Sequence, residues 1–409
     1  MQKFGINREK RGTSDDVRVF QGDAAQQCER LAEEEGGSFS LIYLDPPFST
    51  GSRFSARCRI GAKEWKSGLG SLIVPAYDDN LPREEYLALM RRVLTACKKL
   101  LAPDGLIYIH VDYRMHARFR LLADEIFGEK RFLNEIIWVY ETGGRSKRFF
   151  ARKHDVILLY TVSDNYDLHL EDIARPRSDG RKNHMRRQVD GDGRTYRTIT
   201  SGGKTYTYFD DEPVAPSDVW TDVSHLQQKD PQRTGYDTQK PLKLLERVIL
   251  SSSRPGDKVL DPFCGSGTSA EAAAKNGRRF TGIDLNPLTA EWVRRRTAAA
   301  GAVYEFPPEE TPAVCAAEIV PGIANTAVYL TDFAPGGLPE GTRFPDSVDS
   351  WAVGTAENGV FTMLAEEIRS FRTPQLKLQL NVPRETESIV IRVSDPAGHR
   401  YFYSFAESE

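Results

Sequence analysis

The sequence predicts an α/β fold built around a parallel sheet. Short apolar runs alternate with amphipathic stretches of helical length between residues 17 and 160, and the alternation returns between residues 240 and 296. An acidic residue ends or follows three of the apolar runs, at Asp45, Asp261 and Asp284. Parallel sheets carry their ligand loops at the carboxyl ends of the strands, so we expect these three side chains to line one site.

The alternation gives an expected position for each element. Strands are expected at 17–22, 39–44, 106–111, 134–140 and 155–160 in the first stretch, and at 258–260 and 279–284 in the second. Helices are expected from residue 24, over 83–101, up to residue 127, over 241–252, and from residues 268 and 287.

Two regions depart from this pattern. Residues 161–239 are polar and rich in Arg, Gly and Asp, which indicates an insertion into the α/β unit. Beyond residue 302 the chain is rich in Pro and Gly, with strand-like alternation at 375–382 and a hairpin turn at 395–399, which indicates a small, mainly β unit. We therefore expect four parts, at 14–160, 161–239, 240–301 and 302–409.

Composition excludes several classes of protein. The 409 residues are 40% hydrophobic and 28% charged, as in ordinary globular proteins, and the net charge is −3. No apolar run approaches the roughly 20 residues that cross a bilayer, so we expect a cytoplasmic protein without a membrane partner. The five cysteines are scattered and no His or Cys cluster has ligand spacing, so neither disulfides nor a metal site is expected.

A glycine-rich turn joins a strand to a helix in the second α/β stretch. It reads Asp261-Pro-Phe-Cys-Gly-Ser-Gly-Thr268, and its glycines permit a tight turn and a close approach to a ligand. The Gly-Lys-Thr of triphosphate-binding loops is absent, whereas Asp284 ends the next strand, where it could accept hydrogen bonds from ribose hydroxyls. The alternative is a purely structural turn, with Asp284 serving only the start of the following helix.

A second motif, Asp45-Pro46-Pro47-Phe48, follows an apolar strand in the first stretch. Two consecutive prolines stiffen the backbone and lack N–H donors, so their carbonyls are fixed acceptors. A carboxylate and a rigid carbonyl can orient an amino group, and an aromatic ring can stack on a base removed from its duplex. Read by itself, the motif could equally be a loop.

The two motifs together resemble those of the amino-DNA methyltransferases. Their order, with the catalytic motif first, is that of the β group, which includes restriction-modification methylases and type III modification subunits. Gly22-Asp23, Lys153-His154-Asp155 and Thr238-Gln239-Lys240-Pro241 also match family positions. The resemblance covers residues 17–296 apart from the insertion, and it implies a Rossmann-like S-adenosylmethionine-dependent methyltransferase fold.

The resemblance implies a role for each matching residue. The target base would be held by Asp45, Pro46, Pro47 and Phe48. The cofactor, S-adenosylmethionine, would be bound by Asp23, Lys240, Asp261, Phe263, Cys264, Gly265, Gly267, Thr268 and Asp284, with Asp284 at the ribose and Lys240 near the carboxylate. Cys264 is not expected to act as a nucleophile, because cytosine C5 methylases place that cysteine in a Pro-Cys dipeptide, which this chain lacks. Residues 14–160 would then be the catalytic half, 161–239 the target-recognition region and 240–301 the cofactor half.

Basic side chains near the insertion are candidates for contacts with DNA phosphates, although a solvated loop is the alternative. They are Arg145, Lys147, Arg148, Arg152, Lys153, Arg181, Lys182, Arg186 and Arg187. From its position after Phe48, the polar stretch 51–79 is hypothesised to close over an extruded base.

The expected activity is methylation of adenine N6 in double-stranded DNA. N4-cytosine methylation is the alternative, since it uses the same geometry, but the family's cytosine enzymes more often carry Ser in place of Asp45. Relatives that methylate RNA bases or protein glutamine usually place the glycine motif first and have Asn at the acid position, and a non-catalytic subunit would show broken motifs. A homodimer and a restriction nuclease partner are compatible with the resemblance, but no interface signature is visible.

Overall fold

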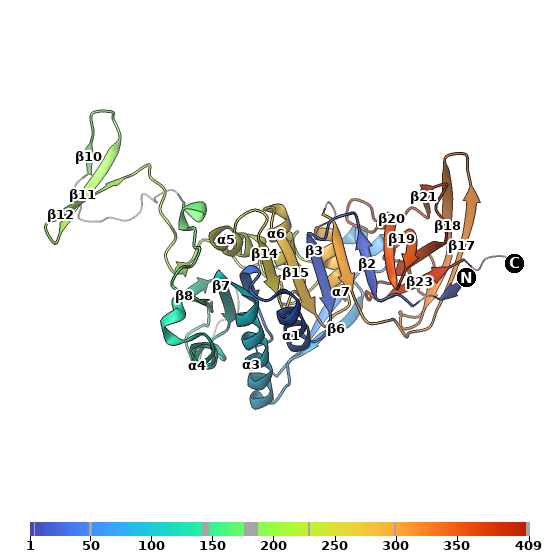
Figure 1. The fold of residues 1–409 in the computed structure, drawn as a ribbon, viewed down its shortest axis with the longest axis horizontal. Coiled ribbons are helices and arrows are strands. Elements are labelled where there is room, and N and C mark those ends of the chain that lie inside the picture. Colours follow the sequence, from blue (N-terminus) through green and yellow to red (C-terminus); the bar gives the residue numbers. More distant parts are fainter. Residues whose placement is uncertain are drawn as a thin grey trace.

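The computed structural model describes residues 1–3, 5–48, 51–140, 147–175, 187–227, 230–297 and 300–405. The molecule is elongated, with an α/β body in the middle, a projecting β hairpin sheet at one end and a β-rich region at the other (Figure 1). The candidate DNA contacts Arg145, Arg181, Lys182 and Arg186 lie outside the described residues.

The body contains the expected parallel sheet. Its parallel strands, in spatial order, are β16 (Ala302–Glu305), β3 (Val17–Gln21), β15 (Arg279–Asp284), β14 (Lys258–Asp261), β4 (Phe39–Leu44) and β7 (Leu101–Val111). Next to β7 lies the antiparallel strand β9 (His154–Thr161), followed by β8 (Phe132–Val139) and the short β13 (Val219–Trp220). The expected α/β fold is confirmed, and the strands that precede Asp45, Asp261 and Asp284 are neighbours.

Helices cover both faces of this sheet. One group consists of α1 (Ala24–Glu35), α3 (Arg83–Leu100) and α4 (His116–Phe127), and the other of α5 (Leu242–Ser252), α6 (Thr268–Lys275) and α7 (Leu288–Arg296). Successive strand residues face opposite sides of a sheet. In β4, Ile42 and Leu44 therefore join the core under α1, α3 and α4, while Leu41 and Tyr43 join the core under α5, α6 and α7. Burial on both faces explains why these strands read as continuous apolar runs.

The stretch after Phe48 has regular structure, which its polar sequence does not predict. It consists of β5 (Arg53–Cys58), α2 (Gly61–Ser67) and β6 (Leu72–Asp78). The two strands pair antiparallel, and Phe54 stacks on Tyr77 with the ring centres 4.8 Å apart. This hairpin forms one wall of the candidate site.

The insertion projects from the body as a three-stranded antiparallel sheet (Figure 1). Its strands are β10 (Arg187–Val189), β11 (Thr195–Ser201) and β12 (Lys204–Phe209). No residue in these strands is buried, so this sheet has no hydrophobic core of its own. Of two short 3-10 helices, η1 (Glu129–Arg131) lies between α4 and β8, and η2 (Leu170–Ile173) follows β9.

The region after β16 consists of strands, and some of them continue the central sheet. The strands that this region adds are β20 (Val360–Ile368), β19 (Ser350–Glu357), β22 (Ile389–Ser394) and β23 (Arg400–Ser404), and two strands that precede β3 in the chain, β2 (Arg8–Arg11) and β1 (Gln2–Lys3), join the same part of the sheet. A separate sheet contains β17 (Ala313–Pro321), β18 (Asn325–Pro335) and β21 (Gln379–Pro383). Strand β2 makes the join, because it pairs with β16 on one side and with β20 on the other. The turn expected at 395–399 connects β22 and β23, with Asp395 N–H donating to the His399 carbonyl at 3.1 Å.

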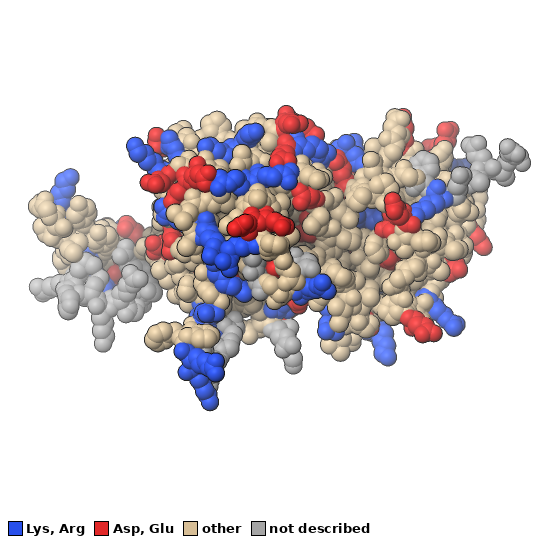
Figure 2. Space-filling view, turned by 90° about the horizontal axis from the view of Figure 1, so that it is seen from below, with Lys and Arg blue, Asp and Glu red and all other residues tan. Residues whose placement is uncertain are grey.

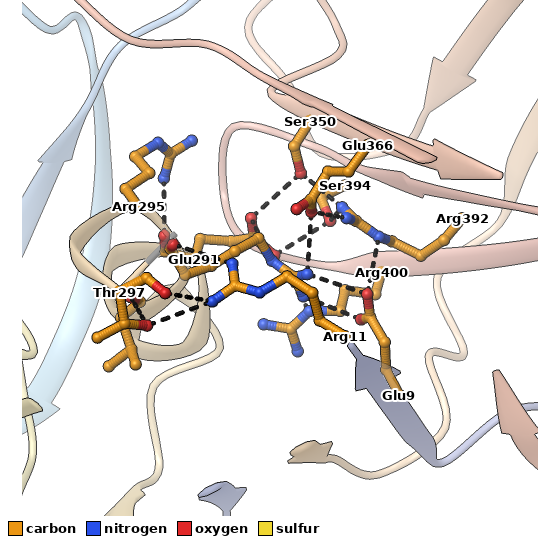
Figure 3. Close-up of polar contacts among 12 residues, drawn as sticks. Glu9, Arg11, Glu291, Arg295, Thr297, Ser350, Glu366, Arg392, Ser394 and Arg400 are labelled. Carbon is orange, nitrogen blue, oxygen red and sulfur yellow. Dashed lines mark hydrogen bonds and ion pairs between the residues drawn. The ribbon is translucent and has the colours of Figure 1, made fainter. Parts of the chain in front are cut away.

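A buried network of charges lies across this join (Figure 3). Glu9 of β2 pairs with Arg294 of α7 at 2.9 Å and with Arg392 of β22 at 3.4 Å, and all three side chains are buried. Glu291 of α7 pairs with Arg400 of β23 at 3.1 Å. Buried ion pairs therefore link the body to the C-terminal strands.

Within the described residues, no helix has both the length and the apolar character required to cross a membrane.

Candidate active site

The three acidic residues expected to share a site do so. Asp45 follows β4, and Asp261 and Asp284 are the last residues of β14 and β15. All three line a cavity of about 340 Å³, together with residues from both α/β stretches. The sequence-predicted residues in its lining are Asp23, Asp45, Pro47, Lys240, Asp261, Phe263, Cys264, Gly265, Thr268 and Asp284. Pro46, Phe48 and Gly267 lie next to lining residues in the chain but do not line the cavity.

The glycine turn has a backbone shape that requires glycine. Gly265 and Gly267 have φ angles of 50° and 74°, in the left-handed region. A Cβ atom on Gly267 would lie 2.7 Å from Cγ2 of Val293 in α7, so the turn also packs against that helix. The turn closes when Gly267 N–H donates to the Cys264 carbonyl at 2.9 Å, and α6 begins at the next residue.

Asp284 holds this turn in place. Its carboxylate accepts hydrogen bonds from Gly265 N–H at 2.7 Å and from Asn286 N–H at 2.8 Å. Burial raises the pKa of Asp284 above its ordinary value, against the effect of these backbone donors. Asp284 therefore both faces the cavity and fixes the position of the glycine turn.

Asp261 also holds the glycine turn, through hydrogen bonds to residues on either side of it. It is 3% exposed, and it accepts hydrogen bonds from Phe263 N–H at 3.0 Å and from the Ser269 hydroxyl at 2.5 Å. Burial raises the pKa of Asp261 to about 7, despite these two donors.

Asp23 lies at the start of α1, on the cavity wall. Its side chain accepts from Gln26 N–H at 2.9 Å and so caps the helix. The preceding Gly22 N–H donates to the Asp284 carbonyl at 2.9 Å, which ties this loop to the end of β15.

Asp45 forms an ion pair with Lys240. The Lys240 ammonium donates to Oδ2 of Asp45 at 2.5 Å, and both side chains are largely buried. In the described part of the chain, Oδ1 of Asp45 is buried without a hydrogen-bond donor. The family resemblance implies Lys240 beside the carboxylate of a cofactor, whereas the structure places it on the carboxylate of the chain's own Asp45. This leaves one oxygen of Asp45 available as an acceptor.

Pro47 and Phe48 of the same motif make contacts of their own. The Tyr86 hydroxyl donates to the Pro47 carbonyl, so that carbonyl, expected as an acceptor for an amino group, already has a donor. The Phe48 ring lies 5.3 Å from the Lys240 ammonium and 6.3 Å from the His110 ring.

A series of buried polar contacts, which begins at Tyr43 two residues before Asp45, is not apparent from the sequence. The Tyr43 hydroxyl lies 2.8 Å from Nδ1 of His110, and Nε2 of His110 lies 3.2 Å from Oδ2 of Asp155, whose other oxygen accepts from Tyr140 at 3.1 Å. Burial favours the neutral form of Asp155, but the hydrogen bond and charge of His110 hold the pKa of Asp155 below its ordinary value. The Lys153-His154-Asp155 motif marks Asp155 in the sequence, but nothing marks Tyr43 or His110 as its partners.

The described basic candidates lie away from the cavity lining. The Arg152 guanidinium lies 4.6 Å from the Phe149 ring centre and donates to the Tyr113 hydroxyl. Lys147 and Arg148 are exposed, whereas Arg187 of β10 pairs with Asp210 at 3.1 Å. On the face drawn in Figure 2, Lys and Arg side chains lie among Asp and Glu side chains over much of the central body.

Comparison with known proteins extends this description. The sequence model of the DNA methylase family matches residues 39–293. The type II methyltransferase M.EcaI of Enterobacter cloacae is 29% identical over 310 residues, which cover 64% of this chain and 66% of that protein. The DNA adenine methyltransferase YhdJ of Escherichia coli K12 is 26% identical over 270 residues, covering 66% of this chain and 78% of YhdJ.

Among solved structures, the DNA modification methylase TTHA0409 of Thermus thermophilus, complexed with S-adenosyl-L-methionine, is 21% identical. Its TM-score is 0.43, and the alignment covers 72% of this chain and all of that one.

The family match contains both motif loops and Lys240. It also contains the strands that bring Asp45 and the glycine turn to one cavity, and it spans more than half of the 409 residues. This chain therefore belongs to the DNA methylase family.

Proposed function

We propose that this chain transfers a methyl group from S-adenosylmethionine to the N6 amino group of adenine in double-stranded DNA. The observation that carries the proposal is the common cavity, which has the glycine turn on one side and the Asp45 carboxylate on the other. A donor and an acceptor held in one cavity need no covalent intermediate on the protein.

The glycine turn, Asp284 and Asp23 form the proposed cofactor half. Gly265 and Gly267 leave the backbone without side chains at the turn, and Asp284 keeps that turn fixed through Gly265 N–H. The Asp284 and Asp23 carboxylates line the cavity, where they can accept from the hydroxyl and amino groups of an adenosine. When bound, S-adenosylmethionine supplies a methyl group activated by a sulfonium.

Asp45 and Phe48 form the proposed substrate half. The free Oδ1 of Asp45 can accept an N–H of the base, and this bond directs the nitrogen lone pair away from the carboxylate. Lys240 holds the other oxygen, and so fixes the plane of the carboxylate. A base extruded from the duplex can stack on Phe48, and the carbonyl of Pro46 is the remaining proline acceptor of the motif.

Adenine is favoured over cytosine by two observations. Asp45 occupies the position at which the resembling cytosine enzymes more often have Ser, and one relative, YhdJ, is by name an adenine methyltransferase. The relatives M.EcaI and M.HpaI are type II methyltransferases, which supports a place in a restriction-modification system.

Incubation with labelled S-adenosylmethionine and unmethylated duplex DNA, followed by nucleoside analysis, tests the proposal. We expect label in N6-methyladenine, loss of transfer by at least about a thousandfold in Asp45→Ala, and retained cofactor binding in that variant. Asp164→Ala is the control, because the Asp164 side chain is 93% exposed and lies outside the cavity. Label in N4-methylcytosine would move the assignment to cytosine, and absence of label with bound cofactor would contradict both.

A further inference from the structure

A second cavity, of about 410 Å³, lies beside the candidate active site. It is lined by the end of β5 and α2, the 231–234 loop, α6, α7 and three loops of the C-terminal region, at Asp349, at 370–371 and at Pro396. The two cavities share no lining residue, and the rings of Tyr236 and Trp292, one from each lining, meet edge to face at 5.3 Å. The C-terminal region thus completes a cavity that the α/β body alone does not enclose.

The lining of this second cavity has an excess of positive charge. It contains four guanidinium groups, on Arg59, Arg233, Arg295 and Arg296, and two carboxylates, on Glu271 and Asp349. Both carboxylates are already paired, Asp349 with Arg295 and Glu271 with Arg296.

Arg59 lacks a carboxylate partner in the described part of the chain. Its only hydrogen bond there runs from Nη2 to the Gly68 carbonyl at 3.4 Å, and its Nε is buried without an acceptor. Burial and the neighbouring Arg295 both lower the pKa of Arg59, while the charges of Asp349 and Glu64 raise it in part. Neither carboxylate lies within ion-pair distance of Arg59, and Asp349 already pairs with Arg295, so the two neighbouring cations favour binding of an anion.

A second donor without an acceptor lies next to Arg59. Trp65 is 7% exposed, and its indole N–H is buried with no acceptor among the described residues. The Arg59 guanidinium lies 5.0 Å from the Trp65 ring centre and 4.5 Å from that of Phe371, so both donors belong to one cluster. Two buried donors without a described acceptor therefore lie in one lining, which favours a ligand that can accept from both.

We propose that this second cavity binds the phosphate group of a nucleotide. A phosphate has enough oxygens to accept from Arg59 and Trp65 together, and guanidinium groups match its geometry. The volume exceeds that of a bare ion, and the rings of Trp65, Trp292 and Phe371 suit a heteroaromatic base. The same chemistry is offered by a free nucleotide and by a nucleotide unit of DNA.

Calorimetric titration of the full chain tests this assignment. We expect thymidine 5′-monophosphate to bind and thymidine not to bind, because the two differ only in the phosphate. Arg59→Gln should weaken binding about tenfold or more, and Trp65→Phe, which keeps a ring but removes the N–H, should also weaken it. Arg57→Gln is the matched control, because Arg57 is exposed and lies outside the lining. Thermal unfolding of each variant shows that it is folded.

A competition experiment with duplex DNA distinguishes the two sources of the phosphate, a free nucleotide and a nucleotide unit of DNA. If duplex DNA displaces the monophosphate, or if only duplex binding is weakened by Arg59→Gln, the site takes a phosphate of DNA. If the monophosphate binds and duplex DNA neither displaces it nor depends on Arg59, the site takes a free nucleotide. The proposal is overturned if neither ligand binds more weakly to Arg59→Gln or Trp65→Phe than to Arg57→Gln.

Discussion

The ammonium of Lys240 lies 2.5 Å from Oδ2 of Asp45, although the two residues are 195 positions apart in the chain. The contact joins the two α/β stretches in the lining of the cavity. It gives Lys240 a role on the carboxylate of the protein itself, in addition to the cofactor contact that the family resemblance implies.

Replacement of Lys240 by Met tests which of these roles dominates. If Lys240 positions Asp45, Lys240→Met should lower the single-turnover rate of methyl transfer about 10- to 100-fold at saturating cofactor and DNA, because a largely buried carboxylate loses its cation. Cofactor affinity should change little. Lys243→Met is the control, since Lys243 lies in α5 and donates to the Asp222 carbonyl at 3.0 Å. A weaker cofactor affinity with an unchanged saturated rate would assign Lys240 to the cofactor instead.

Gly267→Ala should damage both the fold and the cofactor site. The added Cβ would lie 2.7 Å from Val293, and the φ angle of 74° is strained for alanine, so we expect the free energy of unfolding to fall by about 2 to 4 kcal/mol. Cofactor affinity should fall with it, because the turn must move away from α7. Gly256→Ala is a matched control, because Gly256 has a φ of 90° but nothing within 4 Å of an added Cβ.

For that control we expect a smaller loss of about 1 kcal/mol and normal cofactor affinity. Denaturant unfolding and calorimetric titration measure the two effects. Equal losses in both variants would mean that backbone strain alone, and not the contact with Val293, makes glycine necessary at position 267.

Much of the α/β body could be predicted from the sequence, because its buried strands and helices follow regular apolar patterns. Strands such as β4 are buried on both faces and read as apolar runs, and Asp45, Asp261 and Asp284 follow such runs, so their meeting at one edge follows from the parallel sheet alone. The hairpin at 51–79 was not predictable in this way, since its apolar residues form a small separate cluster with Tyr236 and with Leu288 and Trp292 of α7, which are distant in the sequence.

The partners of the site residues were the part that the sequence did not reveal. Lys240 and Asp45, or Tyr43, His110 and Asp155, meet only after the sheet has formed, and no local pattern encodes such pairs. The same holds for β2, whose four charged residues show no apolar alternation but pair with β16 and β20. Edge pairing of this kind depends on which strands remain unpaired elsewhere in the fold.

Asp261→Asn should make stability less dependent on pH. The folded protein keeps a proton on Asp261 up to a pKa of about 7, whereas the unfolded chain loses it near the ordinary value of 3.8. Ionisation therefore lowers the stability of the wild type as pH rises between these values, by up to about 4 kcal/mol. The amide side chain of the variant would remain neutral, so the stability of the variant relative to wild type should increase from pH 5 to pH 8.

Urea unfolding at the two pH values measures this difference. Asp164→Asn, at an exposed position, should show no such change. An equal offset between Asp261→Asn and wild type at both pH values would show that Asp261 ionises with an ordinary pKa in the folded protein.

Lys147→Gln should weaken DNA binding by the same factor for all sequences. Lys147 is exposed and lies in the same basic stretch as Arg148 and Arg152, and a contact with one phosphate contributes about 0.9 to the slope of log affinity against log salt. We expect the slope to decrease by about that amount in fluorescence anisotropy, with no change for the control Lys377→Gln in the C-terminal region. An unchanged slope in Lys147→Gln would remove this residue from the DNA surface.

Glu9→Gln should destabilise the join between the body and the C-terminal strands (Figure 3). Burial disfavours the charged form of Glu9, but Arg294 and Arg392 outweigh it and hold the pKa of Glu9 below its ordinary value. The substitution leaves two buried guanidinium groups with one carboxylate fewer, so we expect the free energy of unfolding to fall by about 3 to 5 kcal/mol at pH 7.

Because the pKa of Glu9 is lowered in the folded protein, the stabilisation by ionised Glu9 is lost as the pH falls through that pKa. The difference in free energy of unfolding between Glu9→Gln and wild type should therefore become smaller in acid. Urea unfolding at pH 7 and pH 3 measures this, with Glu34→Gln as the control, since Glu34 is 52% exposed and lies 4.0 Å from Arg30. Hydrogen exchange should rise together in α7 and β22, which contribute Arg294 and Arg392. A loss as small as that of Glu34→Gln would mean that the remaining carboxylates, Glu291 and Glu366, suffice to balance the buried arginines.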